Sequence, residues 1–154
     1  MLRRQKLTAL PNPLEAEEGR YVLDRQAGFL MRVAMQRHTA IFTARMVQGL
    51  TQTQFAAMSK LHEVGACSQN HLGRQIYLDA ATIKGVVDRL VLRGFLTAMS
   101  DATDRRRRAV TLTARGRQVI EAAMVTAAEI TTETLAPLTA EERHVVVKLL
   151  KKLC

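Results

Sequence analysis

Residues 79–113 predict a capped helix and two short strands, and the loop between the strands carries consecutive arginines from Arg105 to Arg108. The helical part, DAATIKGVVDRLVLRG, begins at a good N-cap, Asp79, and ends at Gly94, which can close a helix. FLTAM and AVTLT, which flank the arginine loop, have the pattern of strands. A hairpin this narrow cannot enclose a core of its own, so it must pack against helices.

The rest of the chain predicts helices. Apolar residues recur at helical spacing over residues 20–48, 51–65, 69–78, 114–135 and 138–153. Thr51 or Thr53 can begin the second of these segments and Gly65 can end it, while Thr139 and Glu142 have the spacing of a capping box. The segment ACS before residue 69 is long enough for one bridge of strand. We therefore predict a mainly α fold with a small β-hairpin.

The predicted helices differ in how much apolar surface they must bury. The helix after Asp79 would bury Ile83, Val86, Val87, Leu90 and Val91. The helix over 114–135 would bury Val119, Ala122, Ala123 and Ile130. The helix over 20–48 is apolar around much of its girth, through Leu23, Ala27, Leu30, Met31, Val33, Ala34, Met35, Ile41, Phe42 and Met46. Such a helix needs more than one neighbour, and a second chain is a natural candidate.

Composition narrows the class of partner. The 154 residues suffice for one domain with a real core, and their formal net charge is +9. This charge favours a polyanion such as nucleic acid, with an anionic membrane surface as the competing partner. No apolar run approaches the roughly 18 residues of a membrane span, and the N-terminus lacks the apolar core of a signal peptide. Two cysteines, Cys67 and Cys154, make no disulfide framework, so we expect a cytoplasmic protein.

The order of the elements is that of a winged helix-turn-helix domain. Two short helices, over 69–78 and 79–94, come before the hairpin. The second helix of such a pair fits the major groove of DNA. An arginine-tipped loop can enter the minor groove, where narrow stretches concentrate negative potential. The arginines of the loop are therefore predicted to contact DNA.

Two motifs make the resemblance to one family specific. VVDRLVLRGFL and DATDRRRRAVTLTARGR resemble the signature of MarR-family transcription regulators, in which D-R-L-x-x-x-G precedes a wing with D-x-R and then L-T-x-x-G. The matching residues are Asp88, Arg89, Leu90, Gly94, Asp104, Arg106, Leu112, Thr113 and Gly116. The resemblance covers roughly residues 79–117. It divides the chain into an N-terminal arm over 1–19, a helical dimerisation region over 20–50 and 113–154, and a DNA-binding domain over 51–112.

The resemblance implies a homodimeric repressor on a pseudo-palindromic DNA operator. Its recognition helix carries over to about residues 80–92. Arg106 would reach the minor groove with Asp104 orienting it, and the other wing arginines would lie near phosphates. The implied DNA-contacting residues are Gln69, His71, Ala81, Thr82, Lys84, Gly85, Arg89, Asp104, Arg105, Arg106, Arg107 and Arg108.

The chain departs from the family pattern in two places. Many relatives carry arginine soon after the first wing strand begins, where this chain has Ala98 and Met99. Arg107 and Arg108 are candidates to replace those basic contacts. Gly85 stands where many relatives have polar or basic side chains, so their base-reading rules do not transfer. A glycine in mid-helix lets another surface come close.

The resemblance also implies a small-molecule effector. The stretch FAAMSKLHEVGACSQNHLGRQIYLDAATIKG is similar to the branch of the family that represses nicotinate breakdown, which implies a hydroxynicotinate inducer. Family ligands are commonly small aromatic acids, held where the dimer helices meet the winged domain. The candidate ligand-binding residues are Arg20, Met31, Met35, His38, Met58 and His71, and further cations for a carboxylate are Arg32, Arg45, His62 and Arg74.

Two other classes of function stay open. Cys67 or Cys154 could make the protein a redox-responsive regulator, and its charge could serve an architectural protein that binds nucleic acid without sequence preference. His62, Cys67 and His71 lack the spacing of a structural zinc site. No Gly-rich phosphate loop, nucleophile elbow or paired-carboxylate motif points to an enzyme. We therefore predict no catalytic site, no metal and no cofactor.

Overall fold

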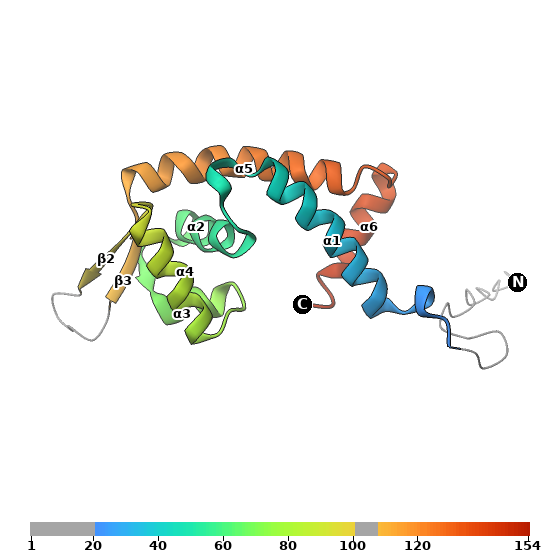
Figure 1. The fold of residues 1–154 in the computed structure, drawn as a ribbon, viewed down its shortest axis with the longest axis horizontal. Coiled ribbons are helices and arrows are strands. Elements are labelled where there is room, and N and C mark those ends of the chain that lie inside the picture. The colour runs from blue at the N-terminus through green and yellow to red at the C-terminus, as the bar shows by residue number, and fades with distance from the viewer. Residues whose placement is uncertain (1–20, 101–107) are drawn as a thin grey trace, which may run out of the picture. The chain divides into compact units, whose positions relative to one another are not determined.

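The structure is a computed structural model that describes residues 21–100 and 108–154, apart from the side chains of Ser100 and Arg108. It divides into two compact units, Met1–His38 and Thr39–Cys154. Figure 1 shows the order of the helices and strands along the chain. Within the described part, no helix has the length and hydropathy that a membrane span requires.

The first helical segment is interrupted at both ends. A short 3-10 helix, Leu23–Arg25, comes before α1 (Ala27–Arg45), and Gln26 between them is extended with a ψ of 125°. After α1, Gln48 is left-handed, with a φ of 56°, inside a second 3-10 turn. The prediction of one continuous helix over 20–48 is therefore wrong at its ends. Gly49, which follows Gln48 with a φ of 58°, is a local signal for the second break.

The second unit holds the remaining described helices, α2 (Gln52–Val64), α3 (Gln69–Gln75), α4 (Ala80–Leu92), α5 (Ala114–Thr134) and α6 (Ala140–Leu150). Their predicted caps are confirmed. Thr51 and Thr139 each form a capping box, and the carboxylate of Asp79 caps α4. Gly65 and Gly94 follow α2 and α4 with φ of 78° and 72°, the left-handed region that favours glycine after a helix.

The strands of the described chain form one three-stranded antiparallel sheet. They are β1 (Cys67–Ser68), β2 (Leu96–Ser100) and β3 (Arg108–Leu112), in the order β1-β3-β2. The predicted hairpin and the predicted bridge are both confirmed, and β3 joins them by pairing with each. The register places Leu96 opposite Leu112. The loop predicted between β2 and β3 falls mainly on residues 101–107, which lie outside the described part.

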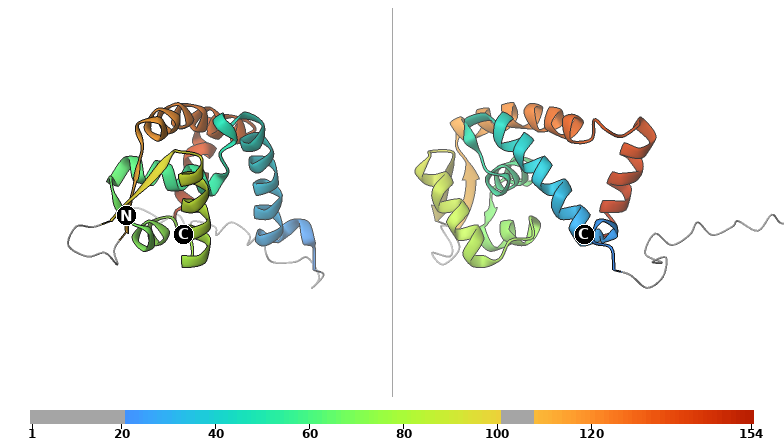
Figure 2. Two further views of the ribbon diagram at one scale, coloured as in Figure 1. Left: turned by 60° about the vertical axis from the view of Figure 1, so that its left-hand side comes forward. Right: turned by 45° about the vertical axis from the view of Figure 1, so that its right-hand side comes forward.

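Helix α5 runs along the second unit and packs against α2 and β3. Figures 1 and 2 show the sheet near the N-terminal end of α5 and α6 at its other end. Large, fully buried side chains fill the space beneath α5, among them Met58, Leu72, Ile83, Leu90, Phe95, Leu96, Ile120 and Ile130. These side chains come from α2, α3, α4, the turn before β2, β2 itself and α5, so one core holds the helix pair and the hairpin together.

Two of the predicted buried stripes need correction. Val91 is 39% exposed, because it lies at the edge of the α4 stripe in the last turn before the chain leaves for β2. On α5, Ala122 is exposed whereas Ile120 is fully buried. The predicted stripe is confirmed at Ala123 and Ile130, and Val119 packs against the core, so only Ala122 is wrong and Ile120 was missed.

The contact between the start of α5 and the turn after α4 explains why the L-T-x-x-G segment has Thr113 and Gly116. Thr113 caps α5 by accepting the backbone N–H of Gly116 at 2.9 Å, and its hydroxyl donates to the carbonyl of Gly94 at 2.7 Å. The backbone N–H of Thr113 donates to the carbonyl of Phe95 at 3.0 Å. A Cβ atom at Gly116 would lie 1.9 Å from that carbonyl oxygen. The start of α5 is thus docked directly on the end of α4, and glycine is required there.

Tyr77, in the turn between α3 and α4, is held in a strained conformation. Its φ is 58°, and its side chain is 85% exposed. A residue other than glycine pays roughly 1–2 kcal/mol in this region. Because the ring buries so little surface, packing does not offset this cost.

We expect Tyr77→Gly to raise the free energy of unfolding by about 1 kcal/mol, since glycine adopts this φ without steric cost but loses more entropy on folding. Urea unfolding followed by circular dichroism measures the change. Tyr77→Ala is the matched control, because it removes the ring and keeps the strained backbone. Equal stabilisation by both variants would contradict the assignment of the strain to the backbone.

Candidate nucleic-acid interface

The caps of α3 and α4 fix the two helices of the predicted helix-turn-helix. Ser68 accepts the backbone N–H of His71 at 3.2 Å at the start of α3. Asp79 accepts the backbone N–H of Thr82 at 2.8 Å and its hydroxyl at 2.7 Å. These hydrogen bonds from Thr82 lower the pKa of Asp79. The contribution of this cap is therefore present above the ordinary carboxyl pKa and is lost as pH falls through the lowered one.

The outward face of α4 presents the predicted DNA-contacting residues of this helix. The exposed ones are Ala81, Thr82, Lys84 and Arg89, and Gly85 is half-buried. The other face of α4 lies in the core. Because the hydroxyl of Thr82 already donates to Asp79, Thr82 retains only acceptor capacity for a partner.

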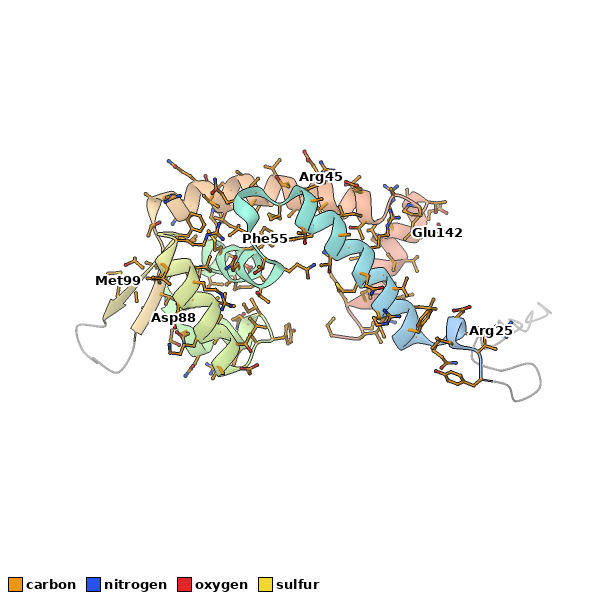
Figure 3. All side chains as sticks on the ribbon, viewed as in Figure 1. Arg25, Arg45, Phe55, Asp88, Met99 and Glu142 are labelled. Atoms are coloured by element: carbon orange, nitrogen blue, oxygen red, sulfur yellow. The ribbon has the colours of Figure 1, made fainter. Side chains whose placement is uncertain are left out.

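The charged side chains of this region have different partners. Nζ of Lys84 donates to Oδ2 of Asp88 at 2.6 Å, and Figure 3 labels Asp88 on α4. Arg93, the C-cap of α4, donates to Oε1 of Gln54 on α2 at 3.2 Å. The exposed Lys84–Asp88 pair adds little to stability, and Lys84 can exchange its partner for a phosphate. Arg93 instead serves to fix the end of α4.

The predicted contacts from α3 lie at the start of that helix. Gln69 is half-buried and His71 is exposed in the first turn. Helix α3 packs against α4, so the two helices bring these residues and the outward face of α4 into one helix-turn-helix unit. His71 also belongs to the predicted ligand set.

The wing is described only in its strands. Asp104, Arg105, Arg106 and Arg107 lie outside the described residues, as does Arg20 of the ligand set. The backbone of Arg108 begins β3, where it pairs with Ser100 of β2. Ala98 and Met99 are exposed on β2, and Figure 3 labels Met99. The strands that carry the predicted arginine loop are therefore in place beside α4.

The predicted ligand-binding residues are spread over both units. In the first unit, Met31 and Met35 are exposed on α1, and His38 is half-buried. In the second unit, His71 is exposed, whereas Met58 is fully buried in the core, with 0% of its surface exposed. Met58 is thus a core side chain in the described chain.

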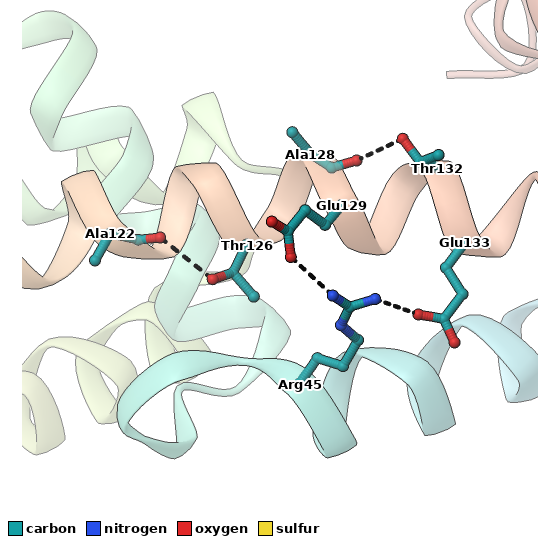
Figure 4. Close-up of polar contacts among 7 residues, drawn as sticks. All are labelled: Arg45, Ala122, Thr126, Ala128, Glu129, Thr132 and Glu133. Atoms are coloured by element: carbon teal, nitrogen blue, oxygen red, sulfur yellow. Dashed lines mark hydrogen bonds and ion pairs between the residues drawn. The ribbon is translucent and has the colours of Figure 1, made fainter.

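Arg45, a further candidate for a ligand carboxylate, is already engaged by two glutamates. It donates to Glu129 at 2.7 Å and to Glu133 at 2.5 Å, as Figure 4 shows. The hydrogen bond to Glu133 is the main cause that raises the pKa of Arg45 above its ordinary value. Both glutamates lie on α5, so Arg45 fastens the C-terminal end of α1 to α5. His62, another candidate, lies 3.5 Å from Glu121 of α5.

The cysteines and the potential metal ligands do not form a cluster. Cys67 is half-buried on β1 and Cys154 is exposed, and both are free thiols. Burial raises the pKa of the Cys67 thiol, which lowers its reactive thiolate fraction. Over residues 21–100 and 108–154, no three His, Cys, Asp or Glu side chains gather closely enough to hold a metal ion.

Comparisons with known proteins show to which family the chain belongs. Residues 50–107 match the sequence profile of the MarR family. The transcriptional repressor NicR of Pseudomonas putida is 35% identical over 144 residues, which span 93% of this chain and 91% of NicR. This chain belongs to the MarR family. The predicted resemblance is confirmed, and this MarR protein is a DNA-binding transcription regulator like its relatives.

Solved structures of similar proteins confirm the winged-helix fold. A probable transcriptional regulator from Pseudomonas aeruginosa is 46% identical with a TM-score of 0.84, over 86% of this chain and 100% of that one. BpsR of Bordetella bronchiseptica is 39% identical with a TM-score of 0.82, over 88% of this chain and 97% of BpsR. That structure concerns the regulation of DNA binding of BpsR by 6-hydroxynicotinic acid.

Two features of this MarR protein were not predicted from its sequence. One is the strained Tyr77 between α3 and α4, for which the sequence offers no signal. The other is the position of the Arg89 side chain, which lies over Gly85. The spacing of Gly85 and Arg89, one helical turn apart, could have suggested this contact.

Proposed function

We propose that this MarR protein is a homodimeric repressor that binds a pseudo-palindromic operator and leaves it when a small aromatic carboxylate binds. The similarity to the repressor NicR over nearly the whole chain carries this proposal. Two recognition helices related by a two-fold axis would meet half-sites about 34–36 Å apart. Roughly 6–10 phosphate contacts would make the affinity fall steeply with salt.

Exposed apolar side chains support the homodimer. On α6 and just after it, these are Val145, Val147, Leu149, Leu150 and Leu153. On α1, they are Leu30, Met31, Val33 and Met35. Monomeric proteins rarely leave large contiguous apolar patches in water, so both helices call for a partner surface. A second copy of the chain could bury the exposed apolar side chains of α1, so no other protein is needed to cover them.

The class of effector rests on BpsR, whose DNA binding is regulated by 6-hydroxynicotinic acid. Because BpsR is 39% identical over 88% of this chain, we propose a hydroxynicotinate or a close aromatic acid as the effector here. Release from DNA would follow a population shift, in which the ligand binds better to a dimer whose recognition helices are wrongly spaced. We propose a cytoplasmic protein, because a transcription regulator acts where its DNA lies.

A thermal-shift measurement tests the effector. We expect 6-hydroxynicotinate to raise the unfolding temperature, because a ligand present at about 100 times its Kd stabilises the native state by about 2.7 kcal/mol. 6-Hydroxynicotinamide is the matched control, since it keeps the hydroxylated ring and replaces only the carboxylate by a neutral amide. Equal shifts with both compounds, or no shift with any aromatic acid, would contradict the proposed effector class.

The proposed roles of the wing arginines predict unequal losses. We expect Arg106→Ala to lower operator affinity more than Arg105→Ala, because Arg106 would enter the minor groove and Arg105 would lie near phosphates. Fluorescence anisotropy with labelled duplex measures both, and sedimentation checks that each variant stays dimeric. Equal losses would mean that the arginine run acts as a diffuse charge.

Anisotropy with the same labelled duplex also tests two alternative functions, a redox-responsive regulator and an architectural nucleic-acid-binding protein. A redox-responsive regulator would lose DNA binding in peroxide, and a Cys67→Ser, Cys154→Ser variant would not. The raised pKa of Cys67 disfavours this alternative, because a thiol reacts as its thiolate. An architectural protein would bind unrelated duplexes as tightly as the operator.

A further inference from the structure

Helix α4 and its C-cap carry three cationic side chains, and two of them have partners within the chain. Nζ of Lys84 lies 2.6 Å from Oδ2 of Asp88. Arg93 donates to Gln54 and also lies over the ring of Phe95, with 4.7 Å from Cζ to the ring centroid. The side chain of Arg89 makes no hydrogen bond or ion pair with any other residue that the structure describes, although its backbone carbonyl accepts the N–H of Arg93.

The guanidinium of Arg89 lies over Gly85. A Cβ atom built on Gly85 would be 3.5 Å and 3.7 Å from the two terminal nitrogens of Arg89 and 3.9 Å from its Cζ. The side chain therefore runs back toward the N-terminus of α4 by about one turn, as long helical side chains do. The fork of donors is presented at the level of Gly85, nearer to the capped end of the helix.

Ala81, Gly85 and Arg89 form one row along the outward face of α4, each one turn from the next. The first two residues are small, so the helix backbone can approach a partner closely along this row. The one long side chain of the row brings its donors to the place that the small residues leave open. This arrangement suits contact with base edges, which form the floor of a DNA groove, better than contact with the phosphates at its rim.

We infer that Arg89, laid over Gly85, reads a guanine in the major groove of each operator half-site. This inference rests on the proposed operator binding. The planar fork of arginine donates two parallel hydrogen bonds to O6 and N7 of guanine, a pairing that no other base edge offers. Lys84, which is paired with Asp88, would contact a backbone phosphate instead of a base.

The experiment begins with selection of tight-binding duplexes from a random pool by the full-length protein. Affinities of wild type, Arg89→Ala and Arg89→Lys are then measured for the selected duplex and for all single-base changes in one half-site. We expect wild type to lose roughly 5- to 150-fold when one particular G·C pair is replaced. For Arg89→Ala, that penalty should disappear at this position and persist at the others. Arg89→Lys should keep only part of it.

Variants of Gly85 test the positioning without removing the arginine. Gly85→Ala adds a Cβ at an ordinary contact distance of 3.5 Å from Arg89 and should keep the guanine preference. Gly85→Leu fills the space that the guanidinium occupies, so it should lose the preference although Arg89 is present. Thermal unfolding confirms that each variant is folded, and Arg117→Ala, which removes an exposed arginine on α5, serves as the control for lost charge.

The outcomes separate the inference from the function on which it rests. Selection of no sequence by wild type would overturn the proposed operator binding itself. Selection of a palindrome whose base preferences stay unchanged in Arg89→Ala would overturn the inference alone. A uniform loss over all duplexes with a smaller salt dependence would likewise overturn it, because it marks a phosphate contact.

Discussion

Gly116→Ala should destabilise the protein by roughly 3–5 kcal/mol or more, a large part of the stability of a typical domain. The new Cβ would lie 1.9 Å from the carbonyl oxygen of Phe95 and 2.8 Å from its carbonyl carbon. Both atoms belong to backbone, and that carbonyl also accepts the N–H of Thr113. Neither side can yield without separating α5 from the end of α4. Urea unfolding followed by far-ultraviolet circular dichroism measures the loss.

Gly28→Ala is the matched control, since it makes the same chemical change at an open position of α1 with no atom within 4 Å. Alanine is favoured over glycine inside a helix by about 1 kcal/mol, so this variant should unfold at the same or higher urea concentration than wild type. If Gly116→Ala were as stable as Gly28→Ala, the joint between Phe95 and Gly116 would be misplaced.

Leu149→Glu should separate the proposed dimer into monomers and weaken operator binding by roughly a hundredfold or more. Leu149 is 51% exposed on α6 within a single chain and lies among other exposed apolar side chains. Burial of a carboxylate against a partner's apolar surface would be strongly unfavourable. Sedimentation equilibrium measures the assembly, and anisotropy with labelled duplex measures the affinity.

His144→Glu is the control for this variant, because His144 is exposed and polar on the same helix. It should leave both the assembly and the affinity close to those of wild type. A Leu149→Glu protein that remains a dimer would show that α6 does not form the subunit interface.

The elements that depend on local chemistry were predictable from the sequence. Asp79 and Gly94 delimit α4 because a carboxylate caps its first turn and a left-handed glycine follows its last. The capping box of Thr139 and Glu142 begins α6 for the same reason. Such signals lie within a few residues of the feature that they determine, so a single sequence contains them.

The features that depend on distant contacts were not predictable in the same way. Tyr77 is left-handed although glycine would suit its φ of 58°, because α3 and α4 on either side fix the turn. Val91 was expected to be buried, and its exposure depends on where the chain leaves α4 for β2. On α5, Ala122 was predicted to be buried in place of Ile120, since both are apolar and only packing distinguishes them.

The candidate site shows the same division. The outward face of α4 follows from its buried stripe, so its exposed residues could be predicted. The partners of the charged residues could not be ranked from sequence, although Lys84 and Asp88 have the spacing of a helical ion pair. Arg45 shows most clearly that the sequence does not reveal which charged residues pair with each other. It was a candidate for a ligand carboxylate, but Glu129 and Glu133, far away along the chain, already occupy it.

A hydroxyl-radical footprint on the selected duplex tests the central claim most directly. The account predicts two protected half-sites whose centres are about 34–36 Å apart, related by the symmetry of the palindrome. The footprint should fade as 6-hydroxynicotinate is added and should weaken steeply with salt. Uniform protection along the duplex, unchanged by the acid, would contradict a ligand-released dimeric repressor.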